Sequence, residues 1–316
     1  MMKRLFLLSI FLFPALFVFS QSTPTDTDRL HEVRAIDVNK SYDFKKLLPE
    51  ITKSGSTPRQ KLQLVYFWIY THIDFDLENF LKNDPLPPQS TQQILKSGKG
   101  TCYEYNALLA EACNYLHIPG YDIEGYVKYY GFSAGQPFTH QNHIWRVIYI
   151  EDQWLMADVL WASGTLSIKN GIYTFNKALH PEYFLTPPAD FLTTHLPADP
   201  IWQFENKPLS VEGFSAKAIG IDDSKRLAYI NYADSIAVMN KLPSDEREIR
   251  SALRAYAFNP ADIDDIFITY YNQAVSQISK RPATKKSLAK AYTYFSAAKK
   301  IVPKLATPAL HTLLGP

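Results

Sequence analysis

The sequence contains little cysteine: its 316 residues include two, Cys102 and Cys113. Both fall within a stretch, from about Cys102 to Leu116, whose apolar spacing predicts a single helix. About 11 residues of helix separate the two Cα atoms by roughly 16 Å, whereas a disulfide requires about 7 Å or less. A disulfide between these cysteines is therefore excluded, and two free thiols need another explanation.

The chain also lacks a large net charge. The formal charge is +2, hydrophobic residues make up 46% and charged residues 20%, which is typical of a soluble globular protein. This balance gives no electrostatic argument for a nucleic-acid partner. Acidic residues are missing after Asp265, whereas seven lysines and one arginine follow, up to Lys304. The basic C-terminal stretch is interpreted as a solvated helix face, with an anionic surface or partner as the alternative.

A long apolar run occurs at the N-terminus, from Leu5 to Phe19, directly after Lys3 and Arg4. At about 15 residues, the run is shorter than the roughly 20 residues that span a bilayer. Basic residues, an apolar run and small polar residues in this order are typical of a secretory signal peptide. We therefore predict a signal peptide at residues 1–20 and export to the periplasm or the extracellular space. An uncleaved membrane anchor is the alternative.

The rest of the chain divides into three parts. Residues 21–56 are polar and mixed, and predict a loosely packed lead-in segment. Residues 57–205 begin with a predicted helix at 58–72, continue with the cysteine-bearing helix, and then change to a period of two residues. Strands are expected at 123–128, 143–150 and 153–159. A buried helix followed by an antiparallel sheet is an α+β pattern.

Residues 206–316 change character again. Amphipathic patterns, including those at 262–279 and 286–302, predict a helical C-terminal region. The alternation of alanine with aromatic residues before Pro303 loosely resembles the second helix of a tetratricopeptide repeat. A single match is weak, because such repeats must stack to bury a core.

Cys102 is the best candidate for a reactive group. It follows Gly98 and Gly100 and begins a predicted helix, where the partial positive charge of the N-terminus stabilises a thiolate. Free backbone N–H groups at the same end can bind a developing oxyanion. The position suits covalent catalysis. Cys113, within the apolar stripe of the helix, is interpreted as a small core residue.

A nucleophilic cysteine needs a base, and the base needs an orienting group. If Glu151 and Asp152 form a two-residue turn between two strands, Trp145 lies opposite Asp158. His143 is then on the same face as Asp158 and diagonal to it, within reach of a hydrogen bond. A slip of one residue in the turn would place the two side chains on opposite faces. The sequence thus predicts a trio of Cys102, His143 and Asp158.

Several motifs around this trio have a familiar order. They are Gly100–Tyr105, His143–Trp145, Trp154–Asp158, Tyr183–Pro187, His195–Pro197 and Trp202–Gln203. Together they resemble the transglutaminase-like superfamily, and within it the kyphoscoliosis-peptidase-like branch. The resemblance implies a papain/transglutaminase-like core with Cys102 as nucleophile, His143 as base and Asp158 as orienting acid. The chain departs from the branch at Ile144–Trp145–Arg146, where Ala-Trp-Asn is usual.

Further candidates are less well defined. Gln93, beside Gln92, is a candidate oxyanion donor that no sequence motif supports. Trp145 and Trp161 are candidate binding residues near the trio. His140 and His143 have no neighbour with ligand spacing, so no metal and no cofactor are expected. His195 is interpreted as structural.

The leading hypothesis is an exported cysteine enzyme that acts on amide bonds of a protein or peptide substrate. Hydrolysis is favoured because water is always available as the acceptor. A calcium requirement has no acidic loop to support it. Two alternatives stay open: a catalytically silent binding or scaffold protein that recognises partners through its helical tail, and a protein cross-linking transglutaminase.

Overall fold

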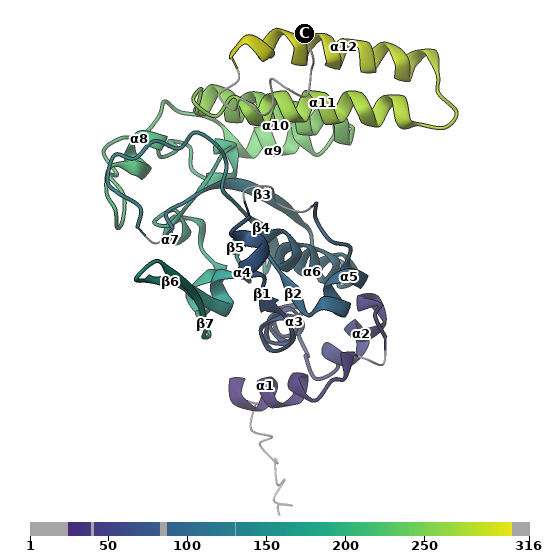
Figure 1. Cartoon of the computed structure of the whole chain (residues 1–316), viewed down its shortest axis with the longest axis vertical. Coiled ribbons are helices and arrows are strands. Elements are labelled where there is room, and N and C mark those ends of the chain that lie inside the picture. Colours follow the sequence, from purple (N-terminus) through teal and green to yellow (C-terminus); the bar gives the residue numbers. More distant parts are fainter. Residues whose placement is uncertain (1–24, 39–40, 83–86, 130, 305–316) are drawn as a thin grey trace, which may run out of the picture.

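The computed structural model describes residues 25–38, 41–82, 87–129 and 131–304, so the predicted signal peptide lies outside the described residues. The helices (Figure 1) are α1 (Asp26–Arg34), α2 (Phe44–Ile51), α3 (Pro58–His72), α4 (Leu77–Phe80), α5 (Thr91–Ser97), α6 (Cys102–Tyr115), α7 (Pro188–Phe191), α8 (Val211–Ser215), α9 (Tyr232–Met239), α10 (Ser244–Phe258), α11 (Asp264–Ser279) and α12 (Lys285–Ile301). The strands are β1 (Asp74–Phe75), β2 (Lys99–Gly100), β3 (Gly120–Val127), β4 (His143–Ile150), β5 (Gln153–Ala157), β6 (Gly164–Lys169), β7 (Ile172–Lys177), β8 (Phe184–Thr186) and β9 (His195–Pro197). Short 3₁₀ segments are η2 (Trp161–Ser163), η3 (Pro181–Tyr183), η4 (Pro200–Gln203) and η5 (Val302–Lys304).

The N-terminal segment is more ordered than the sequence pattern predicts. In α2, Phe44, Leu47, Leu48 and Ile51 follow helical spacing, and all four are buried in the main core. Helix α1 packs on α3. The prediction of a loosely packed lead-in at 21–56 is therefore wrong for the described residues. The apolar stripe of α2 is short and lies between polar residues, so the composition of the segment does not reveal it.

The predicted helix that bears Cys102 and the predicted helix at 58–72 have close to the expected bounds. Helix α3 begins at Pro58 behind Thr57, whose hydroxyl accepts from the Gln60 N–H while the Gln60 side chain returns to the Thr57 N–H. Helix α6 begins at Cys102. Both cysteines are on α6 and both are free, as the helix geometry requires.

Five antiparallel strands form the main sheet in the order β8-β5-β4-β3-β9. Between β4 and β5, Ile150 pairs with Gln153 across a two-residue turn. Glu151 and Asp152 both have positive φ, 54° and 59°, as the tight turns preferred in hairpins require. The predicted register is confirmed over the paired residues, from Ile150 opposite Gln153 to Arg146 opposite Ala157, and Trp145 and Asp158 are the next residues along it.

The sheet is covered on both faces. Helices α2, α3 and α6 contribute to one hydrophobic core with Ile148, Ile150 and Leu155 of the sheet. A second core on the other face joins Trp145 and Val147 to residues of α7, η4 and α9. The α+β class expected from the sequence, a helix bearing the cysteine packed on an antiparallel sheet, is confirmed.

The C-terminal region is helical in its described part, as predicted, and α11 and α12 pack side by side as a hairpin (Figure 1). Polar contacts fix it to the segments that flank strands β9 and β4. Arg254 of α10 donates to both carboxylate oxygens of Asp199, at 2.9 and 2.6 Å, and Asn259 donates to the Phe138 carbonyl at 2.9 Å. One hydrophobic cluster, with Phe214 among its members, also crosses the predicted boundary at residue 205.

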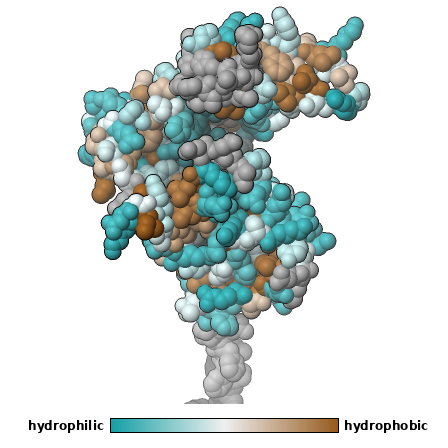
Figure 2. Space-filling view, viewed as in Figure 1, coloured by the Kyte–Doolittle hydropathy of each residue, from teal (hydrophilic) through white to brown (hydrophobic). Residues whose placement is uncertain are grey.

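Apolar side chains also reach the surface. In the space-filling view, hydrophobic residues gather on the C-terminal helices at the top and near the hairpin β6–β7 at the left (Figure 2). Ile172, in the turn region of that hairpin, is 69% exposed. Within the described ranges, no helix combines the length and apolar character needed to cross a membrane.

Candidate active site

Cys102 is held at the entrance of α6 by the segment that precedes it. Strand β2, ending at Gly100, pairs in parallel with β1 and delivers the chain to the helix start. The buried Glu104 carboxylate then accepts from the Thr101 N–H at 2.8 Å, the Thr101 hydroxyl at 2.7 Å and the Gln89 N–H at 3.0 Å. This cap fixes the first turn, so Cys102 has a defined position at the positive end of a 14-residue helix.

His143 and Asp158 form a direct hydrogen bond. The distance from His143 Nε2 to Asp158 Oδ2 is 2.5 Å, and both side chains are buried. The bond exists because the hairpin register places His143 of β4 on the same face as Asp158, the residue that directly follows β5. The pair predicted from the sequence is therefore brought together in the structure.

Asp158 receives more than one donor. Its Oδ1 accepts the backbone N–H groups of Leu160 and Trp161, at 2.9 and 3.0 Å, in the turn after β5. Its Oδ2 accepts not only from His143 but also from Nε2 of His195, on β9, at 3.1 Å. Four donors thus hold a fully buried carboxylate in one orientation, which satisfies a charge that would otherwise be costly to bury.

The ionisation states follow from these contacts. Burial opposes the charged form of His143, but the Asp158 carboxylate and its hydrogen bond outweigh it and raise the pKa to about 10. Burial likewise opposes ionisation of Asp158, but the two histidines hold its pKa well below its usual range. His195 differs: burial lowers its pKa to about 4 despite the same carboxylate. At neutral pH, the site therefore holds an imidazolium, a carboxylate and a neutral imidazole.

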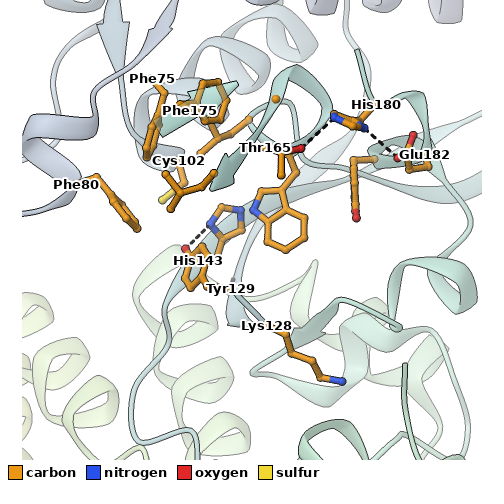
Figure 3. Close-up of a pocket in the computed structure, with 15 residues that line it drawn as sticks. Phe75, Phe80, Cys102, Lys128, Tyr129, His143, Thr165, Phe175, His180 and Glu182 are labelled. Atoms are coloured by element: carbon orange, nitrogen blue, oxygen red, sulfur yellow. Dashed lines mark hydrogen bonds and ion pairs between the residues drawn. The ribbon is translucent and has the colours of Figure 1, made fainter. Parts of the chain in front are cut away.

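The second nitrogen of His143 faces a pocket that Cys102 also lines (Figure 3). His143 Nδ1 lies 3.1 Å from the Tyr129 hydroxyl, which itself donates to the Asn142 carbonyl at 2.7 Å. Cys102, which lines the same pocket, also contributes to the raised pKa of His143. The His143 ring thus bonds to the buried Asp158 carboxylate and lines the same pocket as the half-buried Cys102 thiol.

The additional candidates from the sequence have different positions. The Gln93 side chain accepts from the Ser90 N–H and hydroxyl at the start of α5, so it is a helix cap and does not line the pocket. Trp145 is fully buried behind the histidines, with its ring 5.1 Å from that of His195, so it is a core residue. Trp161 does line the pocket, 5.9 Å from the His143 ring between centroids.

Arg146, where the sequence departs from the usual pattern, does not alter the charge around His143. Its side chain lies on the other face of β4, where it pairs with Asp122 and donates to the Gly120 carbonyl at 3.2 Å. The departure thus concerns the packing beneath α6.

Among the described residues, His143, Asp158 and His195 bring three potential metal-ligand atoms within 4.8 Å of one another. The two imidazole Nε2 atoms already bond to Asp158 Oδ2 and the group is buried, which fits a hydrogen-bonded triad better than an open metal site. Sequence reasoning missed this role of His195 and those of Tyr129 and Glu104. Only Glu104 carried a signal, as the fourth residue of a Thr-x-x-Glu capping box.

Comparison with known proteins agrees with this architecture. Residues 45–159 match the family model described as the Transglutaminase-like superfamily, so the chain carries a transglutaminase-like domain. Kyphoscoliosis peptidase of Mus musculus is 29% identical over 199 residues, 61% of this chain and 29% of the relative. The Homo sapiens protein of the same name is 28% identical over 185 residues, 58% of this chain and 27% of the relative. The matched part is thus less than a third of either relative's length.

Among solved structures, a TGase matches with a TM-score of 0.27 and 16% identity, over 52% of this chain and 37% of that one.

Proposed function

We propose that this chain is a cysteine enzyme that acts on amide bonds through Cys102, His143 and Asp158. The observation that carries the proposal is the His143–Asp158 hydrogen bond of 2.5 Å, on a ring whose other nitrogen faces the pocket lined by Cys102. In this scheme the Cys102 thiolate attacks the carbonyl carbon, and His143 then protonates the departing amine. Asp158 fixes the tautomer and orientation of His143.

The start of α6 supports the same scheme. The N–H groups of the first helical turn have no carbonyl partner within their own helix, and that of Cys102 lies next to the reacting sulfur. It can donate to the oxyanion that forms when the thiolate adds to the carbonyl.

Hydrolysis is the proposed outcome, with water accepting the acyl group from Cys102. Two relatives, covering about three-fifths of this chain, are named peptidases. The pocket beside Cys102 is also lined mainly by aromatic and aliphatic side chains, which favour neither the lysine amine nor the glutamine amide used in cross-linking.

The test is the pH dependence of Cys102 alkylation by iodoacetamide. A free thiol loses about 50-fold in rate between pH 8.5 and pH 6.5, because its thiolate fraction falls. We expect the wild type to lose less than about 5-fold and His143→Ala to lose close to the free-thiol value. Cys102→Ala measures the background from Cys113. If the wild type shows the pH dependence of a free thiol and His143→Ala does not change it, the enzyme proposal is overturned.

Export remains part of the proposal, carried by the apolar run from Leu5 to Phe19 after Lys3 and Arg4. We expect the chain recovered from the periplasm or the medium to begin near Gln21. Intact-mass measurement after expression of the full sequence checks this. Recovery of the unprocessed chain in the cell would contradict it.

A further inference from the structure

The pocket beside Cys102 has a volume of about 310 Å³, at the small end of the range for ligand pockets. Its aromatic and aliphatic walls come largely from two parts of the chain that are distant in the sequence, one at residues 74–80 and one at residues 164–183. Phe75 and Phe80 come from β1 and α4, Leu166 and Phe175 from the hairpin β6–β7, and Tyr183 from η3. In the close-up, Phe75, Phe80 and Phe175 stand around the cysteine (Figure 3).

The aromatic walls are in contact with one another and form a fixed surface. The Phe75 ring lies 5.2 Å from that of Phe80 and 4.9 Å from that of Phe175, measured between centroids. Gly164, at the start of β6, makes room for this arrangement. A Cβ there would lie 2.5 Å from Phe175 Cζ, so any larger residue would displace the ring.

The charged groups at the edge of the pocket already have partners. The Lys128 ammonium points away from the cysteine, donates to the Gly220 carbonyl at 2.5 Å and lies 4.3 Å from the centre of the Phe214 ring (Figure 3). On the other side, His180 bridges Glu182 and Thr165, at 3.2 and 3.1 Å. Apart from His143 and a few polar groups that already have partners, the space next to Cys102 is therefore bounded mainly by apolar surface.

We propose that this pocket is the specificity site of the enzyme and binds a bulky aromatic side chain of a peptide substrate. The ring belongs to the residue that carries the scissile carbonyl or to the residue before it, because Cys102 lines the same pocket. Aromatic rings gain from contact with other rings as well as from leaving water. A glutamine or lysine side chain would lose hydrogen bonds to water there and find few partners on the mainly apolar walls. This inference rests on the proposed function.

The test uses dipeptidyl acyloxymethyl ketones, which report directly on Cys102. The thiolate forms a C–S bond at the ketone methylene, the bond from that carbon to the carboxylate oxygen breaks, and the carboxylate leaves with the electron pair. Probes with phenylalanine at either position are compared with the Ala-Ala, Gln-Ala and Lys-Ala probes. We expect phenylalanine at one position to raise the second-order rate of labelling by roughly 10- to 100-fold.

Two variants on one hairpin separate the pocket from its surroundings. Leu166→Trp fills the pocket and is expected to bring the phenylalanine preference close to one. Ile172→Trp adds the same ring at an exposed position outside the pocket and should keep the preference. Phe175→Ala removes one wall and provides a second variant should Leu166→Trp fold poorly, as judged by its thermal unfolding.

The outcomes distinguish the two proposals. A phenylalanine preference that Leu166→Trp abolishes and Ile172→Trp retains supports the inference. Equal labelling by all probes, with iodoacetamide alkylation still dependent on His143, overturns the inference and leaves the proposed function standing. If the pH dependence of iodoacetamide alkylation is the same in the wild type and in His143→Ala, both proposals are overturned.

Discussion

His143 and His195 both donate to Oδ2 of Asp158, from strands that are separated in the sheet by β3. The two rings have opposite ionisation preferences, because the pKa is raised to about 10 for His143 and lowered to about 4 for His195. The neutral His195 thus supplies a hydrogen bond to the carboxylate without a second positive charge. The arrangement makes His195 a positioning residue for the proposed triad.

His195→Phe should therefore impair the site more than His195→Gln, whose side-chain N–H can still donate to Asp158. We expect His195→Phe to lower the rate of Cys102 alkylation at pH 6.5 by roughly 10-fold or more, and His195→Gln to stay within about 3-fold of the wild type. The rate of Cys102 alkylation measured against pH checks this. If His195 only stabilised the fold, the molecules that remain folded would show the same pH dependence as the wild type. Identical profiles for both variants and the wild type would refute the role.

The lowered pKa of His195 also predicts a dependence of stability on pH. Between about pH 6.5 and pH 4, an unfolded histidine binds a proton that the folded His195 does not. Stability is therefore lost as the pH falls through this window. The free energy of unfolding should drop by about 2–3 kcal/mol more in the wild type than in His195→Gln. Urea titrations at a series of pH values measure the difference, and parallel curves would contradict it.

Glu104 should matter for stability because its buried carboxylate accepts three hydrogen bonds at the start of α6. Glu104→Ala removes the cap and leaves buried donors unpaired, so we expect a loss of about 2–4 kcal/mol in the free energy of unfolding. Glu111→Ala, on the same helix but without this role, should change it by less than about 0.5 kcal/mol. Urea denaturation followed by circular dichroism compares them, and equal losses would refute the cap.

Cys113 should be inert in the folded protein. It is completely buried, and burial raises the pKa of its thiol to about 11. We expect iodoacetamide at pH 8 to label Cys102 at least roughly 100-fold faster than Cys113. Intact-mass spectrometry counts the labels, and both thiols should react in concentrated urea. Rapid double labelling of the native protein would show that the core opens around α6.

Asp262 connects the C-terminal region to the sheet, since the Tyr126 hydroxyl donates to its Oδ2 at 2.8 Å. Burial, with smaller contributions from Asp264 and Asp265, raises its pKa to about 7. The charged form is thus unfavourable in the folded state above pH 7, and the cost is relieved as the pH falls through 7 toward 4.

Asp262→Asn should accordingly increase the free energy of unfolding by about 1–2 kcal/mol at pH 8, after allowance for solvent screening, with a gain that shrinks toward pH 4. The exposed Asp190→Asn is the control and should show no such trend. Thermal or urea unfolding at both pH values measures the gain. A gain that is independent of pH would mean that ionisation of Asp262 is not its cause.

The sequence by itself determined much of the local structure. Helix α3 was predictable from Thr57-Pro58 and its apolar spacing, and α6 from the glycines before Cys102, because caps and periodicity are local properties. The hairpin register was equally local: a two-residue turn at Glu151–Asp152 fixes every pairing beyond it, including the placement of His143 near Asp158.

Only the tertiary structure decided what surrounds that pair. His195 is 37 residues from Asp158 and reaches it through the pairing of β9 with β3, which no local pattern specifies. The pocket likewise depends on Phe75 and Phe175 meeting across 100 residues of chain. Gln93 had the right chemistry for an oxyanion donor, but its side chain caps the start of α5 and does not line the pocket. Long-range pairings depend on the packing of the whole core, and for that reason a single sequence does not reveal them.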